Sequence, residues 1–197
     1  MAIRCADSNP RQLIKIFNSL LMLLSRDQKK QLYMRRTTAA ISREDQTRVM
    51  RALSATKLSQ VRSYPEVGPK LHAFLTMLGE YMRAHLHARP LTTDQVTSVE
   101  VGRITSDEDW KLIEVAVGHG LLYPNIEAAN TDDLPNREGT FHLAYVLAPH
   151  FLLLPRRGKV VSLGTIYRYQ RLGKEGRKAI LDGQDGELPL FNAGDNR

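Results

Sequence analysis

The sequence predicts a mostly α fold with a small β wing. Apolar residues recur at helical spacing in three stretches of the first half of the chain, which indicates three amphipathic helices. In the second half, the short segment "LLY" and the segment "TFHLAYVL" flank a polar loop rich in turn-forming residues, which indicates two strands and their connection. Three helices, a strand, a long polar loop and a returning strand are typical of a winged helix-turn-helix domain.

The first helix is predicted from about Pro10 to Leu24. Asn9 precedes it as a natural N-cap, and a proline in the first turn loses no intrahelical hydrogen bond. One apolar stripe marks the side of this helix that we expect to be buried, and it consists of Leu13, Ile14, Phe17, Leu20, Leu21 and Leu24.

Two further helices follow in the first half. The second begins after Ser42, a natural N-cap, and continues to about Arg62. Glu44 and Asp45 suit the positive end of its dipole. The third starts in "VGPKLHAFL", with Pro69 at its first position. Its predicted buried face consists of Leu71, Phe74, Leu75, Leu78 and Met82.

The second half is more irregular. The segment "ARPLTTDQV" predicts a break followed by a short helix. A further helix begins after Ser106 as N-cap, places Trp110, Ile113 and Val117 on one face, and ends at a glycine of "GHG". After the strand pair, "RRGKVVSLGTIYRY" indicates a basic turn, another short strand and a last helix.

We expect three parts along the chain. Residues 3–64 form a helical segment, residues 65–170 form the winged-helix domain, and residues 171–197 form a flexible tail. The tail is expected because the chain is rich in glycine and charge from about Lys174. The helix that begins at Pro69 lies at the boundary and can be shared by the first two parts.

Charge is distributed unevenly over the 197 residues, whose net charge is +7. Residues 1–64 carry a net charge of +9, residues 65–150 carry −6, and residues 151–197 carry +4. A polyanionic partner for the two ends of the chain is one interpretation, and a solvated basic face is the other. The middle of the chain would repel a polyanion.

The sequence does not indicate a disulfide-bonded, membrane-spanning, metal-binding or catalytic protein. The single cysteine, Cys5, excludes an intramolecular disulfide and favours a cytoplasmic protein. No apolar run approaches the roughly 18 residues of a membrane span, so no membrane partner is expected. His85 and His87 are two residues apart on a helix and point to different faces, so no metal site is predicted. No catalytic set of Ser, His, Asp or Cys can be assembled either.

Arg11 lies in the first turn of the first predicted helix, where the helix dipole already presents partial positive charge. This position costs a few tenths of a kcal/mol, up to about 1 kcal/mol. A bound anion reverses the sign of the effect, because free N–H groups, the dipole and a guanidinium can converge on a phosphate. An arginine that simply reaches into water is the alternative interpretation.

The segment "SNPRQLIKIFNSLL" resembles the sensor-2 helix in the lid of AAA+ ATPases. The segments "ISREDQTRVMRALSATKLSQV", "PEVGPKLHAFLTMLG" and "GTFHLAYVLAPHFLLLPRRGKVVSL" follow in the order found in bacterial members of the origin-recognition, or initiator, type. The resemblance covers roughly residues 3–170 and implies a helical lid over residues 3–64, followed by a C-terminal winged helix. It also implies that Arg11 contacts nucleotide phosphates in an intact ATPase.

The nucleotide-binding core of such an ATPase is missing from the sequence. No GxxxxGK[ST] loop is present, and "RLGKEGRKAI" has a Gly-Lys pair without the required spacing or hydroxyl. No strand that ends in paired acids offers a magnesium site. We therefore expect the C-terminal portion of an ATPase, which is not an enzyme by itself and holds no cofactor. ATP and Mg would belong to the intact parent.

The winged helix predicts duplex DNA as a partner, because a recognition helix normally enters the major groove. The best candidate for that helix begins "SDEDWKLIE", however, and its three acids would face phosphates. The residues expected to bind nucleic acid are therefore basic ones near the last strand and helix, extended by two lid clusters: Arg156, Arg157, Lys159, Arg168, Arg171, Lys29, Lys30, Arg35 and Arg36. A packing or protein-docking role, with a protein partner or self-association, is one alternative, and a stand-alone winged-helix DNA-binding protein is the other.

Overall fold

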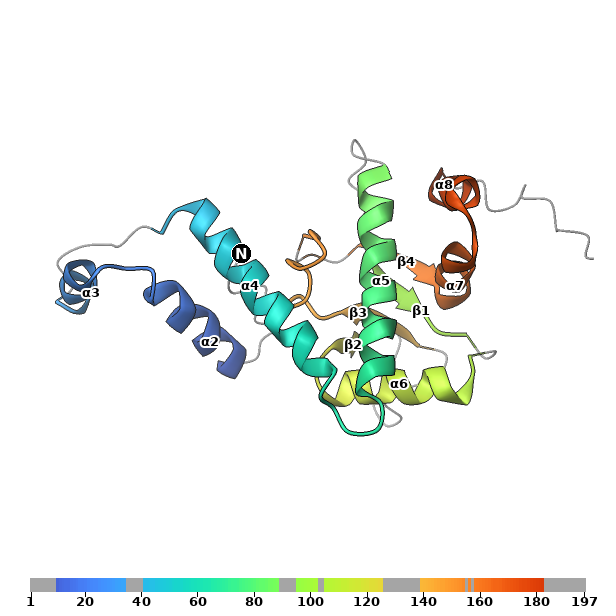
Figure 1. Ribbon diagram of the computed structural model, residues 1–197, viewed down its shortest axis with the longest axis horizontal. Helices are drawn as coiled ribbons and strands as arrows, with labels where there is room; N and C mark the ends of the chain where they lie inside the picture. Colours follow the sequence, from blue (N-terminus) through green and yellow to red (C-terminus); the bar gives the residue numbers. More distant parts are fainter. Residues whose placement is uncertain are drawn as a thin grey trace, which may run out of the picture.

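The computed structural model describes residues 10–34, 41–88, 95–102, 105–125, 139–154, 156 and 158–182. These ranges contain seven helices and four strands (Figure 1). The helices are α2 (Pro10–Leu21), α3 (Arg26–Tyr33), α4 (Arg43–Val61), α5 (Gly68–Ala88), α6 (Asp107–Gly118), α7 (Leu163–Arg171) and α8 (Lys174–Asp182). The strands are β1 (Val96–Glu100), β2 (Leu122–Pro124), β3 (Thr140–Leu143) and β4 (Lys159–Ser162).

The four strands form one mixed sheet in the order β2-β3-β1-β4. β3 is antiparallel to both of its neighbours, and Phe141 lies opposite Val99 of β1 and Pro124 of β2. β4 runs parallel to β1 at one edge, with Val161 opposite Val99. β2 and β3 lie at the two segments where the sequence predicts a strand pair, and the prediction of a mostly helical fold with a small sheet is confirmed.

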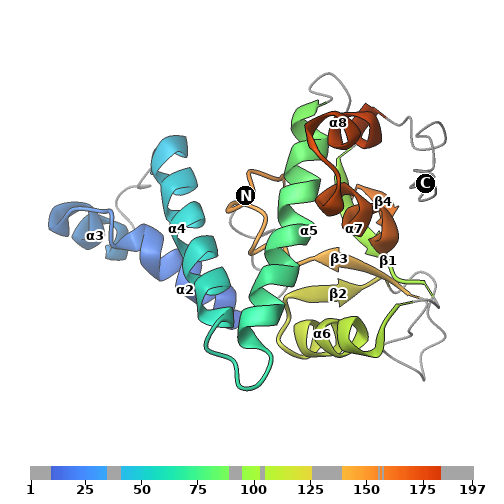
Figure 2. The ribbon, with the colours of Figure 1, turned by 45° about the vertical axis from the view of Figure 1, so that its right-hand side comes forward.

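Helix α5 is the centre of the main core. It contacts α4, α6, α7, α8 and β1 (Figure 2). Its buried face contains every residue predicted for it from the sequence, namely Leu71, Phe74, Leu75, Leu78 and Met82. One continuous apolar cluster extends from Leu58 and Val61 of α4, through α5 and the sheet, to Ile166 of α7 and Ile180 of α8.

Gly79 lets a neighbouring aromatic ring pack closely against α5 inside this core. The aromatic ring of Phe151 packs directly over this glycine of α5, and a Cβ atom at Gly79 would lie 2.4 Å from the ring carbons. The segment that follows β3 is thereby held against α5. The same segment is held against α4, because the buried Ser54 hydroxyl donates to the Leu147 carbonyl and accepts from the His150 N–H.

A smaller apolar cluster joins α2 to the first half of α4. Its buried residues are Ile16 and Leu20 of α2 and Met50 of α4. The stripe predicted for the first helix is therefore correct at Leu20 and at Leu24, although α2 ends at Leu21, and it is wrong at Ile14 and Phe17, which are 59% and 46% exposed. The reason is that α4 covers only the side of α2 that carries Ile16, so the rest of the apolar surface of α2 faces outward.

Two further sequence predictions concern the middle and the end of the chain. The short helix expected within "ARPLTTDQV" falls mainly on residues 89–94, which lie outside the described ranges, and Val96–Glu100 form β1 with four of its five residues buried. The flexible tail expected over residues 171–197 is wrong for Lys174–Asp182, which form α8. Ile180 of α8 is buried against the main core, and this apolar contact outweighs the glycine and charge of the segment. Residues 183–197 lie outside the described ranges.

None of the helices in the described ranges has both the length and the hydropathy that crossing a membrane requires.

Candidate nucleic-acid interface

The basic turn between β3 and β4 is held at both of its ends by Gln95. This residue is fully buried, and its side-chain amide pairs with the backbone of Leu154 in both directions: Nε2 donates to the carbonyl at 2.9 Å, and Oε1 accepts from the N–H at 3.1 Å. The Gln95 carbonyl accepts from the N–H of Lys159 at 2.8 Å. Residues 154 and 159 are therefore both fixed to the start of β1.

Gly158 is needed for this arrangement. A Cβ atom at this position would lie 1.8 Å from the carbonyl oxygen of Gln95, and that oxygen belongs to the backbone directly before β1 and cannot move away cheaply. The glycine thus lets the turn approach β1 closely enough to form the hydrogen bond at Lys159. Arg156, which is partly buried, and Lys159, which is exposed, lie in this segment. Arg157 lies outside the described residues.

Helix α7 follows β4 directly and carries two of the predicted cations. Ser162 caps its N-terminus by accepting from the Thr165 N–H at 3.1 Å. Arg168 and Arg171 are exposed in its last turn, where the helix dipole favours positive charge. β4 and α7 contact each other, so the structure brings Lys159 and these two arginines onto neighbouring elements at one edge of the sheet (Figure 1).

The lid clusters lie elsewhere. Lys29 and Lys30 belong to α3, which both views place at the end of the molecule opposite to α7 and α8 (Figures 1 and 2). The structure therefore does not join them to the cations of β4 and α7 in one surface. Arg35 and Arg36 lie outside the described residues. Arg11 is exposed in the first turn of α2, which contains no acidic residue.

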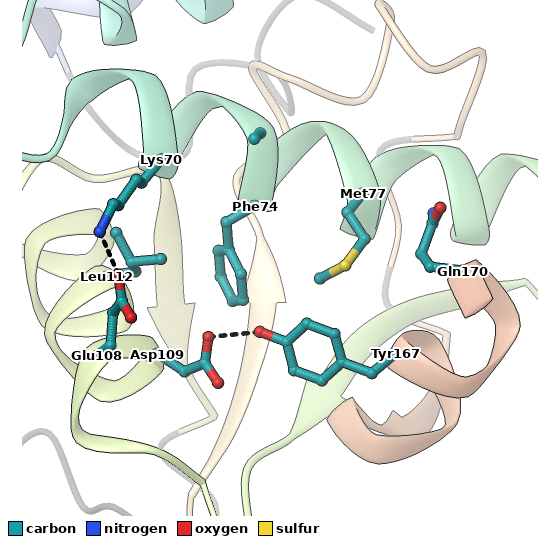
Figure 3. Close-up of a pocket in the computed structure, with 9 residues that line it drawn as sticks. Lys70, Phe74, Met77, Glu108, Asp109, Leu112, Tyr167 and Gln170 are labelled. Carbon is teal, nitrogen blue, oxygen red and sulfur yellow. Dashed lines mark hydrogen bonds and ion pairs between the residues drawn. The ribbon is translucent and has the colours of Figure 1, made fainter.

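The acidic start of α6 is engaged in contacts within the molecule. The Tyr167 hydroxyl of α7 donates to Oδ1 of Asp109 (Figure 3), and the Ser106 hydroxyl donates to Oδ2 of the same residue at 2.8 Å. Lys70 of α5 pairs with Glu108 (Figure 3). Burial, together with the hydrogen bond to Asp109 and its charge, raises the pKa of Tyr167 above its usual value. The first turn of α6 thus connects α5 to α7.

A groove of about 550 Å³ lies among these three helices. Phe74, Met77 and Leu112 form its apolar part, and the Asp109–Tyr167 and Lys70–Glu108 pairs lie along it (Figure 3). A recognition helix needs its N-terminal residues free to reach base edges. The first turn of α6 carries three acidic residues instead, and α5 and α7 supply partners to Glu108 and Asp109, so this end of α6 is engaged within the molecule.

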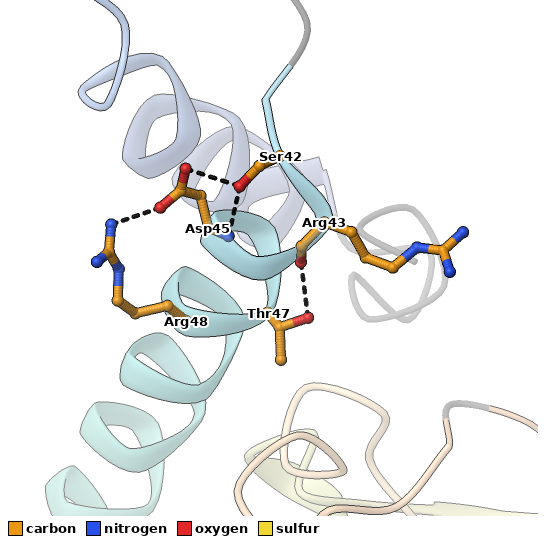
Figure 4. A network of polar contacts seen from close by, with 5 residues as sticks. All are labelled: Ser42, Arg43, Asp45, Thr47 and Arg48. Atoms are coloured by element: carbon orange, nitrogen blue, oxygen red, sulfur yellow. Dashed lines mark hydrogen bonds and ion pairs between the residues drawn. The ribbon is translucent and has the colours of Figure 1, made fainter.

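Asp45, one of the two acids in the first turn of α4, is also paired within the molecule. The Asp45 carboxylate accepts from the Ser42 hydroxyl and pairs with Arg48, while the Ser42 hydroxyl accepts from the Asp45 N–H (Figure 4). Thr47 donates to the Arg43 carbonyl, and the Arg43 side chain extends away from this network (Figure 4). The N-cap predicted at Ser42 is confirmed.

Comparison with known proteins places the chain in a family. The fold and the clamped basic turn define a mostly helical protein with a mixed sheet and a basic edge. A family model described as ORC-CDC6-like matches residues 1–163, and the chain belongs to the ORC-CDC6-like family. The match reaches the first residue of α7, so nearly all of α7 and the whole of α8 follow it. No curated protein and no solved structure matches the chain.

Sequence reasoning missed Gln95, Tyr167 and the helix α3. The sequence does hold a signal for α3, since Ser25 and Gln28 form a capping box in which each side chain bonds the other residue's backbone N–H. No local pattern marks Gln95 or Tyr167, because their partners lie 59 and 58 residues away in the chain.

Proposed function

We propose that this chain is the C-terminal lid and winged-helix portion of an initiator-like AAA+ ATPase, and that it binds duplex DNA through the basic turn, β4 and α7. The observation that carries the DNA-binding part is the contrast between two surfaces. The acids of α6 are used inside the molecule, whereas the basic turn is fixed by Gln95 next to exposed cations of β4 and α7.

Rigid presentation of cations favours phosphate binding. A side chain on a fixed turn loses less conformational freedom when it binds than one on a mobile loop. The edge that carries Lys159, Arg168 and Arg171 would contact the DNA backbone, which supplies most of the affinity but little sequence information. Helix α6 would then support this edge through Tyr167 and would not itself enter the major groove.

The lid part of the proposal rests on family membership and on the position of Arg11. In an intact ATPase, Arg11 would contact the γ-phosphate and couple the nucleotide state to the position of the lid. ATP and Mg would be bound by the core of that parent, and this chain alone would not hydrolyse ATP. The absence of a GxxxxGK[ST] sequence supports this division of roles.

Titration of a fluorescent 20-base-pair duplex at 50 mM and 200 mM salt tests the DNA-binding part. We expect affinity to fall steeply with salt, and the double variant Arg168→Gln/Arg171→Gln to reduce the slope of log K against log salt by about 2. The matched control is Lys29→Gln/Lys30→Gln on α3, which should change the slope less. No binding by the unmodified chain at 50 mM salt would show that the DNA-binding proposal is wrong.

A protein-interaction module is the second candidate, and exposed apolar side chains on α2 and α3 favour it. Met22 is 78% exposed and Tyr33 is 88% exposed, and both line a groove of about 630 Å³ between the two helices. Large apolar side chains gathered at one surface favour contact with another protein. Sedimentation velocity over a hundredfold range of concentration tests self-association at this surface, with Met22→Ser/Tyr33→Ser as the variant.

A further inference from the structure

Helices α7 and α8 pack against α5 and border a groove of about 910 Å³ at the C-terminal end of that helix (Figure 2). This volume lies within the roughly 300–1,000 Å³ of sites that bind small ligands. Ala88, the exposed last residue of α5, lines the groove, and the partly buried Leu172 and Leu181 add apolar surface. Nearly all of α7 and the whole of α8 follow residue 163, so the family match does not cover this groove.

Arg177 fixes α8 to the end of α7 and forms part of the groove lining. Its Nε donates to the carbonyl of Tyr169 at 3.1 Å, and its Nη2 donates to the carbonyl of Gln170 at 3.1 Å. The guanidinium carbon lies over the Tyr169 ring, 5.3 Å from its centroid. Tyr81 of α5 meets the same ring edge-on, with the centroids 5.1 Å apart. The lining therefore holds an arginine plane and an aromatic ring in fixed positions.

The groove continues the basic surface of β4 and α7. Residues 158–182 contain six basic and two acidic residues, a net charge of +4, and the lining itself has three cations and two acids. Lys174 and Lys178 lie one turn apart on α8, are exposed, and make no ion pair with a carboxylate of the described residues. Lys174 follows Arg171 by three residues, so a polyanion that contacts α7 meets further cations at the groove.

Apolar and aromatic surface beside cations suits an unpaired nucleotide better than a duplex. The bases of a duplex are stacked on one another, so a protein that contacts only its backbone uses cations and leaves apolar side chains without a role. An unstacked base can lie on an arginine plane or an aromatic ring while cations contact the phosphates of the strand. The Arg177–Tyr169 pair and the leucines of the groove therefore gain from contact only with a base that is outside a duplex.

We infer that the groove of α5, α7 and α8 binds an unpaired nucleotide, so that the chain recognises the junction between duplex and single-stranded DNA. This inference rests on the DNA-binding part of the proposed function and adds a second kind of contact to it. The duplex lies on Lys159, Arg168 and Arg171, and an unpaired base beyond its end lies in the groove. Lys174 and Lys178 bind the phosphates beside that base.

Duplexes with and without an overhang test the inference. The blunt 20-base-pair duplex is compared at 100 mM salt with the same duplex carrying five unpaired thymidines, on a 3′ end or on a 5′ end. We expect one of these overhangs to lower the Kd about tenfold, which is the effect of one stacked base. Five abasic nucleotides keep the phosphates and should lower the Kd about threefold at most. Equal Kd values for the blunt duplex and both thymidine overhangs, or equal gains from abasic and thymidine overhangs, would overturn the inference.

A substitution at Ala88 locates the unpaired base. Because Ala88 lines the groove and is exposed, Ala88→Glu places a negative charge beside the expected phosphates without disturbing the core. We expect the gain from the thymidine overhang to fall from about tenfold to about twofold or less, while the Kd of the blunt duplex changes less than about twofold. Ala88→Gln has the same size without the charge and is the matched control. If Ala88→Glu keeps the full gain, the base does not bind in this groove and the inference is wrong.

The two lysines of α8 test the phosphate contacts. Lys174→Gln/Lys178→Gln should weaken binding of the thymidine-overhang duplex about tenfold and of the blunt duplex about threefold at most. The control is Lys29→Gln/Lys30→Gln on α3, which should leave the ratio of the two Kd values unchanged. Equal weakening of both duplexes by the α8 variant would assign these lysines to the duplex surface and would count against the inference.

The blunt duplex separates failure of the inference from failure of the proposed function. If the blunt duplex binds and neither overhang improves its affinity, the inference alone fails. If neither blunt nor overhang duplexes bind at 50 mM salt, the proposed DNA binding fails and the inference fails with it. An acidic, apolar peptide is the other occupant that the charge of the groove would fit. Binding of a peptide of alternating glutamate and leucine that is lost in Ala88→Glu, with no gain from either overhang, would make the groove a protein-docking site.

Discussion

The part of the molecule around the sheet and the part formed by α2, α3 and α4 differ in how fully their apolar side chains are buried and their charged side chains are paired. Around α5, a single core buries side chains from α4 to α8, and the acids of α6 find partners on α5 and α7. Among the described residues the α2–α4 cluster buries three, while Phe17 and Met22 stay exposed. The comparison indicates that the first part is complete in itself and that the second presents surface for a ligand or partner.

The largest expected effect tests this difference in burial. Phe141 is fully buried at the centre of the sheet, so Phe141→Ala should lower the free energy of unfolding of the chain by about 3–5 kcal/mol. Ile16→Ala should instead destabilise the α2–α4 pair and leave the main core folded. Urea unfolding measures the first, and amide hydrogen exchange measures the second. Loss of protection in α5 or β3 of the Ile16→Ala variant would contradict the independence of the two parts.

Gly79→Ala should come next, because it tests how tightly the main core is packed. A Cβ atom at Gly79 would collide with the ring of Phe151, and relief requires moving that ring or α5. We expect a loss at the upper end of the 1–3 kcal/mol that overpacking typically costs, measured by urea unfolding. The double variant Gly79→Ala/Phe151→Leu should recover part of the lost stability. If Gly79→Ala were as stable as the unmodified chain, the close packing of the Phe151 ring on Gly79 would be refuted.

Gln95→Ala is expected to have a smaller effect on stability and a measurable one on DNA binding. It removes both hydrogen bonds to Leu154, at a cost of about 1–3 kcal/mol for the backbone groups left without partners. Duplex affinity should fall because the basic turn is no longer fixed. Gln95→Glu is the matched variant, since it keeps the acceptor at 3.1 Å but loses the donor. Unchanged DNA affinity in both variants would show that the turn does not need to be fixed.

The smallest expected effect concerns Tyr167. Since its pKa lies above the usual 10.0, the folded state favours the neutral phenol, and this contribution to stability is complete below pH 10 and decreases as the pH rises beyond it. Tyr167→Phe should cost about 1 kcal/mol at pH 7 through the lost hydrogen bond to Asp109. Thermal unfolding between pH 8 and 11 should show a weaker alkaline decline for the variant than for the unmodified chain. Equal declines would argue against a Tyr167–Asp109 contact in solution.

Much of the helical fold could be predicted from local sequence. Capping residues such as Ser42 and Ser106 and the apolar spacing of α5 are short-range signals, and the structure confirms them. Strand β1 and helix α8 could not be predicted in this way. β1 is stabilised by pairing with residues of β3 and β4 that lie 40 or more positions later in the chain, and α8 by packing of Ile180 on the core.

In the candidate site, too, local features could be predicted from the sequence and contacts between distant residues could not. Cations such as Arg168 and Arg171 can be read directly from the sequence, but what holds them in place cannot. The clamp at Gln95 and the link between Asp109 and Tyr167 depend on contacts between residues nearly 60 positions apart. Composition therefore predicted that the end of the chain is basic, and it did not predict that the acids of α6 are already paired.

Hydrogen exchange of the chain with and without a 20-base-pair duplex at 50 mM salt tests the central claim most directly. If the basic turn, β4 and α7 form the DNA surface, added protection will be confined to residues 154–171, and α6 will exchange as it does in the free protein. Added protection over Asp107–Gly118, with none over residues 154–171, would show that α6 is the DNA-binding helix and would contradict the claim.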